Sequence, residues 1–128
     1  MTNKRLDARG KGEYVYDFAH DIMTFKVKDR DYKKSVDFDN IVVDFDKEDF
    51  ATGMRIFDAS KIFKLSRLQL KNVVGFEFNA NVEDKIITLQ LRFTCAMRNK
   101  QKVVQGQDFI REAVDVIIND SAVTCSAT

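Results

Sequence analysis

The acidic residues between positions 35 and 58 are the feature of this sequence best suited to chemistry. Asp44, Asp46 and Asp49 offer carboxylate oxygens at the short spacing that hard divalent cations bind. The run lacks the central glycine and the terminal glutamate of an EF-hand loop. Carboxylates on the solvent face of strands and in turns also keep a sheet soluble and discourage edge pairing. We favour this second interpretation and keep a divalent-metal site at these three residues as an alternative.

A basic segment follows the acidic one, and its charges recur at helical spacing. It contains Lys61, Lys64, Arg67 and Lys71 without an intervening acid. Steps of three, three and four residues would place these cations on one face of a helix. A basic stripe can follow a phosphate backbone, so a nucleic-acid-binding module is a further alternative. The same pattern describes a solvated helix face, or a surface that pairs with the acidic 35–58 region.

Catalytic motifs are missing from the sequence, and we predict neither catalytic residues nor a cofactor. His20 is the one histidine, and its place between Ala19 and Asp21 predicts an exposed turn residue. No nucleophile elbow, CxxC or HExxH motif occurs, and the five glycines are too scattered to cradle a phosphate. Cys95 and Cys125 are too few for a zinc site. We expect two buried thiols, with a disulfide left open if their strands are neighbours.

The composition indicates one soluble domain with a phenylalanine-rich core. The chain has 128 residues, of which 45% are hydrophobic and 32% charged, and its formal net charge is +1. These values argue against disorder, a membrane protein or a global attraction to nucleic acid. The first residues lack the apolar stretch of a signal peptide. We therefore expect a cytoplasmic protein, with a flexible tail at 1–12 and a single domain at 13–128 that divides loosely near residue 72.

Alternation of apolar and polar residues predicts that much of the chain is β-strand. A hairpin is expected to turn at 19–21, and the clearest strand spans residues 85–97. There Ile87, Leu89, Leu91, Phe93, Cys95 and Met97 share one face, and Thr88, Gln90, Arg92 and Thr94 share the other. Six matches to a two-residue period are typical of a long, half-buried antiparallel strand. We expect its apolar face to pack on the phenylalanines of the first hairpins or on helices.

Two helices complete the predicted fold. The first is short, covers about 59–64, and could be capped by Asp58 or Ser60. The second lies near the C-terminus, where Phe109, Ile110, Ala113, Val114, Ile117 and Ile118 recur at three- and four-residue spacing after a candidate N-cap, Asp108. Val123 and Cys125 could add a last short strand. The predicted fold class is α+β, with antiparallel β-meander sheets, a short mid-chain helix and a C-terminal helix.

Four motifs give the chain a family resemblance. They are YDFAHDIM from Tyr16, VDFD from Val36, IVVDFD from Ile41 and GMRIFDAS from Gly53. In this order, over about 14–62, they resemble a widespread small family of unknown function. The rest of the chain resembles its longer, archaeal form, in which stretches like 99–101 and 105–109 recur. The resemblance implies no catalytic residues. Short members are regarded as antitoxin-like partners of small toxins, and this chain departs from them by its long C-terminal extension.

These observations favour a non-enzymatic protein that acts through contacts with a protein partner or with itself, as a homodimer. This hypothesis rests on a strand-rich sequence that lacks a catalytic constellation. The nucleic-acid and metal hypotheses stand beside it as alternatives. If the polar face of the 85–97 strand is sensitive in function but not in stability, that face is the contact surface.

Overall fold

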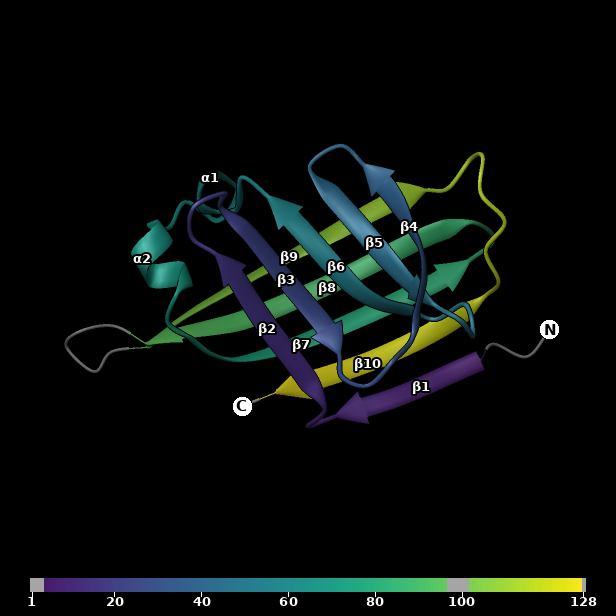
Figure 1. Cartoon of the computed structure of the whole chain (residues 1–128), viewed down its shortest axis with the longest axis horizontal. Helices are drawn as coiled ribbons and strands as arrows, with labels where there is room; N and C mark the ends of the chain where they lie inside the picture. Colours follow the sequence, from purple (N-terminus) through teal and green to yellow (C-terminus); the bar gives the residue numbers. More distant parts are fainter. Residues whose placement is uncertain (1–3, 97–101, 128) are drawn as a thin grey trace.

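Two five-stranded sheets make up the computed structural model, which describes residues 4–96 and 102–127 (Figure 1). The first, sheet B, has the strand order β2-β3-β6-β5-β4, and all its neighbours are antiparallel. Its strands are β2 (Gly12–Asp17), β3 (Ile22–Val27), β4 (Tyr32–Phe38), β5 (Ile41–Asp46) and β6 (Ala51–Phe57). The strands are short, and β2–β3, β4–β5 and β5–β6 follow each other directly as hairpins.

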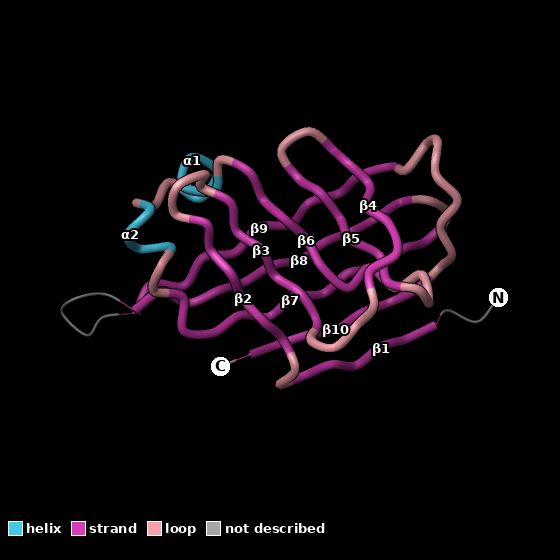
Figure 2. The backbone as a smooth tube through the Cα atoms, viewed as in Figure 1, coloured by secondary structure: helices cyan, strands magenta, loops and turns pink. Residues whose placement is uncertain are grey.

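The second sheet, sheet A, is assembled from both ends of the chain. Its order is β1-β10-β7-β8-β9, and only the β1–β10 pair is parallel. The strands are β1 (Lys4–Arg9), β7 (Val73–Glu83), β8 (Ile86–Ala96), β9 (Lys102–Glu112) and β10 (Ser121–Ala127). Figure 2 shows how far strands dominate the chain.

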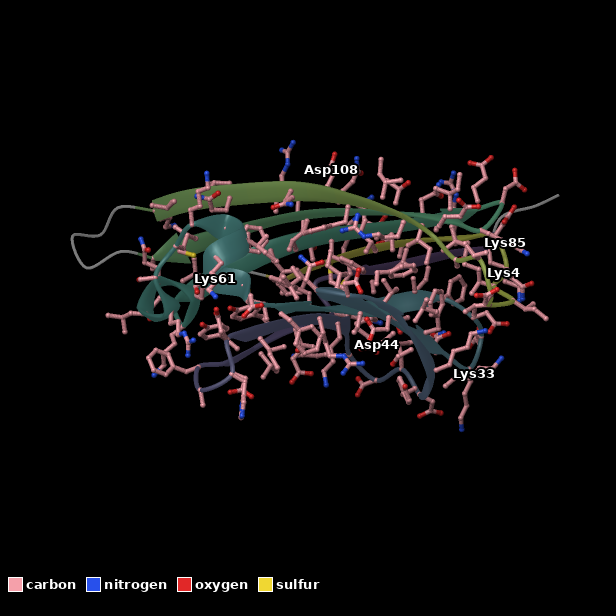
Figure 3. All side chains as sticks on the ribbon, turned by 90° about the horizontal axis from the view of Figure 1, so that it is seen from above. Lys4, Lys33, Asp44, Lys61, Lys85 and Asp108 are labelled. Atoms are coloured by element: carbon pink, nitrogen blue, oxygen red, sulfur yellow. The ribbon has the colours of Figure 1, made fainter. Side chains whose placement is uncertain are left out.

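The sheets form two stacked layers, seen edge-on in Figure 3, and their strands cross in Figure 1. Alternation along each strand sends one set of side chains into the shared core, as expected for antiparallel sheets. The Phe25 ring of sheet B lies 5.0 Å from Phe76 and 6.1 Å from Phe93 of sheet A, between ring centroids. The expectation that the first hairpins and the long strand pack their phenylalanines together is confirmed.

Two short helices link the sheets and close one end of the sandwich (Figure 1). Helix α1 (Ala59–Phe63) lies within the predicted helix, and α2 (Arg67–Leu70) follows with Ser66 and Gln69 in a capping box. Asp58 does not cap α1 through its side chain, contrary to our expectation. Phe63 packs edge-on against Phe93 at 4.9 Å, which brings α1 into the common core.

Aspartates provide most of the tight turns. Positive φ is rare outside glycine but is best tolerated by Asn and Asp, whose short side chains can bond locally. The aspartates with positive φ are Asp21, Asp29, Asp39, Asp49, Asp58 and Asp84. A chain with five glycines and no proline thus makes its hairpins with acids. This accounts for part of the acidic 35–58 region.

The predicted α+β fold class is wrong: the fold is mostly β, with no C-terminal helix in the described residues. The stretch assigned to that helix belongs to β9 up to Glu112 and then to a loop. Phe109, Ala113 and Ile118 are buried, but Ile110, Val114 and Ile117 are exposed. The helical spacing therefore does not correspond to one buried face. β-branched residues, which favour strands, are frequent there.

The N-terminal segment also differs from the expected tail, because residues 4–9 form β1 beside β10. Gly10 has a φ of +75° in the turn after β1. Gly12 begins β2 where the chain crosses between the sheets, and a Cβ there would lie 2.5 Å from the Phe76 ring. These glycines permit a tight crossover and do not mark a loose end.

The long alternating strand is confirmed over its described length. β8 runs from Ile86 to Ala96, with Leu89, Leu91 and Phe93 buried and Gln90 and Arg92 exposed. Met97, which we expected on the same face, lies outside the described residues. The final short strand is also confirmed as β10. Among the described helices, neither α1 nor α2 has the length and apolar character needed to span a bilayer.

Candidate functional site

The outer face of sheet A carries an ordered array of polar side chains. On this face Arg92 of β8 lies between Glu77 of β7 and Gly106 of β9. In the next row Gln90 lies between Asn79 and Asp108. Thr124 and Ser126 of β10 extend these rows beyond β7. Residues of one row therefore come from four strands, and the ladder register fixes their spacing.

A hollow of about 510 Å³ lies over the centre of this array. Its lining includes Glu77, Asn79, Gln90, Arg92 and Asp108. Gly106 contributes no side chain, so the surface stays low beside Arg92. Further depressions beside it share Asn79, Glu77 or both with the central hollow. The outer face of sheet A is thus a broad, shallow polar surface, and Asp108 projects from it in Figure 3.

The central side chains of this array are unpaired, whereas Ser126 at its margin accepts a hydrogen bond from the Gly10 amide. In the described part of the chain, no hydrogen bond or ion pair is made by the side chains of Glu77, Asn79, Gln90, Arg92 or Asp108. Carboxylates and a guanidinium lie near each other without a direct contact of 4.0 Å or less. Along the free side of the sheet, Val104 and Ile110 of β9 are 66% and 64% exposed. The surface therefore combines free hydrogen-bonding groups with an apolar margin. We call it the sheet A face.

The three predicted metal ligands do not share a site, although Asp44 and Asp46 lie two residues apart on β5. Asp44 accepts two hydrogen bonds from Arg55, at 2.8 and 3.2 Å. Asp49 lies 3.0 Å from Lys33 and accepts a second bond from Asn119. Hydrogen bonding to Lys33 lowers the pKa of the Asp49 carboxyl.

Asp46 is the most constrained of the three. It is 1% exposed and lies 2.7 Å from the Arg30 guanidinium. Its other oxygen accepts the amides of Glu48 and Phe50 and so closes the 46–50 turn. Three carboxylates thus have three different basic partners. No group of three or more His, Cys, Asp or Glu able to hold a metal occurs among the described residues.

The four predicted nucleic-acid contacts surround α1 and α2 and do not form one helical stripe. Lys61 belongs to α1, Lys64 ends it in a left-handed conformation, and Arg67 begins α2. Arg67 donates to the carbonyls of Phe18 and Ala19. Lys71 lies 5.0 Å from the centroid of the Phe18 ring. The break at Lys64 ends the helical period on which the predicted stripe depended.

His20 is exposed in the β2–β3 turn, as expected, and its Nδ1 lies 2.9 Å from Asp17. Hydrogen bonds from His20 lower the pKa of the Asp17 carboxyl. Cys95 and Cys125 are buried free thiols, and β7 separates their strands. Burial raises the pKa of the Cys125 thiol to about 11. Neither feature forms a nucleophilic site.

A buried hydrogen-bond cluster joins the first and last motifs of the family resemblance. Asp21, 2% exposed, accepts the Tyr16 hydroxyl at 2.7 Å and the Ser60 hydroxyl at 2.6 Å. The Ser60 amide also donates to it. Burial would raise the pKa of the Asp21 carboxyl, but these hydrogen bonds hold it below its ordinary value. The cluster fastens the β2–β3 turn to the start of α1, and we call it the latch.

Sequence reasoning identified only part of the sheet A face. The alternation of 85–97 correctly assigned Gln90 and Arg92 to the polar side. The sequence analysis does not place Glu77 and Asn79 in a site, and it interprets Asp108 as a helix cap. Val103 and Val104 do indicate a strand, but the sequence does not show that this strand continues through Asp108 to Glu112.

Comparison with known proteins assigns the chain to a protein family of unknown function. The sequence profile of a protein family of unknown function, DUF2283, matches residues 13–60, which comprise sheet B and the latch. The chain is 33% identical over 88 residues to a Methanosarcina mazei protein provisionally named a hypoxanthine phosphoribosyltransferase, covering 69% of this chain and 72% of that protein. It is 31% identical over 100 residues to an uncharacterised Methanocaldococcus jannaschii protein, covering 74% and 86%.

The chain therefore belongs to the DUF2283 family, and the resemblance seen in the sequence is confirmed. The archaeal relatives align over more of the chain than the family profile does. No solved structure matches it.

Proposed function

We propose that this chain is a non-enzymatic cytoplasmic protein that binds a folded protein partner through the sheet A face. The observation that carries the proposal is the unpaired polar array on that face. A buried polar group costs free energy unless it is hydrogen-bonded, and an exposed unpaired group is satisfied by water that a partner can replace. The array spans several strands, as a protein contact requires.

The charges of the face specify the chemistry of the partner. Arg92 calls for a carboxylate or carbonyl acceptor, whereas Glu77 and Asp108 call for basic or amide donors. The two acids beside Arg92 disfavour a polyanion, because like charges in an interface suppress wrong partners. The exposed Val104 and Ile110 supply an apolar margin. We therefore assign a protein surface of mixed charge as the partner, in preference to nucleic acid.

Site-specific crosslinking in the source cells can test this proposal. A photoreactive residue is introduced at Gln90 in one variant and at Lys26, exposed on the outer face of sheet B, in a matched control. We expect one defined protein to be crosslinked from position 90 but not from position 26. The captured protein is then purified and its affinity for the chain measured directly.

Point variants complete the test with the purified partner. Arg92→Ala and Asp108→Asn are each expected to weaken binding about tenfold or more, as interface anchors do. Lys26→Ala should leave the affinity unchanged. Equal crosslinking from both faces, or binding that is insensitive to Arg92 and Asp108, would contradict the proposal.

Nucleic-acid binding is a second candidate because Lys61 and Lys64 make no ion pair within the described residues. With Arg67 and Lys71 they gather four positive charges around α1 and α2. Phosphate binding predicts affinity that falls as salt rises. Changing Lys61 and Lys64 to Glu should then abolish binding of a labelled duplex at low salt, and unchanged binding would reject this candidate.

We do not propose the activity named for the Methanosarcina mazei relative. Transfer of a phosphoribosyl group needs a site that holds several phosphates, for which glycine-rich turns before helices are a common solution. In the described part of this chain the helices span five and four residues, and the glycines are dispersed. Turnover of hypoxanthine by the purified protein would overturn this assignment.

A further inference from the structure

We infer that the free edge of β9 pairs with β9 of a second copy of this chain, in antiparallel register about Gln107. The inference concerns the edge of sheet A, whereas the proposed function concerns the face. Either can therefore fail without the other.

β9 is an unusually open edge. It has 11 residues and pairs with β8 over its whole length without a bulge. It is the last strand of sheet A, and no described strand lies on its other side. A long regular edge presents a row of backbone groups ready to pair with another strand, and proteins normally protect such edges. The strand contains no proline, which would interrupt that row.

The other edges of the two sheets are protected. β1 has six residues, and four of them are charged. β4 is interrupted by a bulge between Tyr32 and Lys34. β2 spans six residues, and its Tyr14 hydroxyl donates to the Leu70 carbonyl near α2. Short length, charge and bulges are the usual means of blocking edge pairing, and β9 has neither short length nor a bulge.

The sequence of β9 complements itself. A two-fold axis through Gln107 places each residue opposite a defined residue of the second copy. The outward pairs are Lys102 with Glu112, Val104 with Ile110, and Gly106 with Asp108. Opposite charges and apolar pairs directly across a ladder are stabilising. The exposed Val104 and Ile110 would cover each other in both halves of the interface.

Neighbouring registers lack this complementarity on the outward face. A two-residue shift in one direction sets Val104 against Asp108, and a shift in the other sets Asp108 against its own copy. Odd shifts are excluded for a symmetric pair, because opposite residues of an antiparallel ladder lie on the same face. The charges and apolar residues on the outward face of β9 therefore favour one register.

The pairing would merge sheet A of one copy with sheet A of the second copy into one continuous sheet. The two-fold axis of an antiparallel pair is perpendicular to the sheet, so both sheet A faces would lie on the same side. A partner protein would then meet one continuous surface of ten strands. In Figure 1, α1, the β4–β5 turn and the adjoining ends of β3, β5 and β6 extend past β9 in projection, so the two copies must meet at an angle.

Oxidative crosslinking can test the register in the full-length chain. The variant Gln107→Cys places two thiols across the two-fold axis, where Cα atoms of paired residues lie within the range that a disulfide spans. We expect it to form a covalent dimer on mild oxidation. The matched variant Gln105→Cys faces Phe109 of the second copy and should stay monomeric under denaturing electrophoresis. Equal crosslinking of the two variants would overturn the inference.

Charge exchange tests the same contact without oxidation. Light scattering should show a dimer for the unmodified chain. The double variant Val104→Lys/Ile110→Lys should raise the dissociation constant of the dimer about tenfold or more, because lysines would then face each other. Val104→Lys/Ile110→Glu should restore the dimer, because each lysine would face a glutamate. Denaturant midpoints identify any folding defect, and both positions are exposed in the monomer. An unmodified chain that stays monomeric would overturn the inference, also where the cause is a clash between the elements that extend past β9.

Discussion

The two outer faces of the sandwich use polar residues in opposite ways. On sheet B, polar groups bond to one another: Arg55 grips Asp44, and Ser35 donates to the same carboxylate at 2.6 Å. On sheet A, the groups around Arg92 make no such bonds in the described part of the chain. Both faces are charged, so charge alone does not distinguish them. The pairing of the charges separates a self-sufficient surface from one available to a partner.

The family profile covers the sheet whose polar groups are paired with one another. It spans sheet B and ends at the latch. β7, β8 and β9, which carry the unpaired array, follow it in the sequence. The segment that defines the family thus supplies a closed layer with its own ion pairs. The proposed contact surface belongs to the part of the chain that distinguishes this longer form.

The largest effect we predict contrasts the two sides of β8. Leu91 is fully buried between the sheets, so Leu91→Ala should lower the free energy of unfolding by about 2–5 kcal/mol, the usual cost of such a cavity. Gln90→Ala, one residue away on the sheet A face, should change it by less than about 0.5 kcal/mol. Denaturant titration measures both. Equal losses would show that the face is structural.

A second prediction compares one carboxylate from each outer face. Asp46→Asn removes the charge that holds Arg30 and weakens the 46–50 turn, so we expect a loss of about 2–3 kcal/mol in unfolding free energy. Asp108→Asn, which breaks no described contact, should cost less than about 0.5 kcal/mol. Thermal and denaturant unfolding report both variants. A comparable loss at Asp108 would contradict the assignment of the sheet A face as unpaired.

The sequence was sufficient where one face of a strand is buried and alternation is strict. Ile87 through Cys95 follow a two-residue period because one side meets the core and the other meets water. The motifs of the family resemblance were also informative, since Tyr16, Asp21 and Ser60 meet in the latch. Their meeting required a tertiary arrangement that spacing could not provide.

The sequence misled where an edge strand has no clean buried face. In β9 only Phe109 is fully buried, so strand alternation is weak and helical spacing emerges by coincidence from Phe109 to Ile118. β1 was missed for a related reason, because four charged residues conceal the inward-facing Leu6 and Ala8. The carboxylates at 44–49 suggested a metal, but their basic partners Arg30 and Lys33 come from an earlier part of the chain.

A third prediction concerns the latch under acid. The pKa of the Asp21 carboxyl in the folded chain lies below its ordinary value, so its contribution to stability is fully present above that ordinary value and is lost as the pH falls through the folded value. Asp21→Asn should lower the unfolding free energy near neutral pH by about 1–2 kcal/mol. The difference from the parent chain should shrink under acid. A constant difference from neutral to strongly acidic pH would show that the carboxylate charge is irrelevant.

The smallest predicted effect is the difference in coupling energy between a charge pair on sheet B and one on the sheet A face. A double-mutant cycle on Asp44 and Arg55, both partly exposed, should give a coupling of about 0.5–1 kcal/mol, typical of a well-formed surface ion pair. The same cycle on Glu77 and Arg92, which lie opposite each other on β7 and β8 without a direct contact, should give a clearly smaller coupling. Alanine replacements and denaturant midpoints suffice for both cycles. If the second coupling matched the first, the sheet A face would already be satisfied by its own charges, and the main reason for assigning it a partner would be lost.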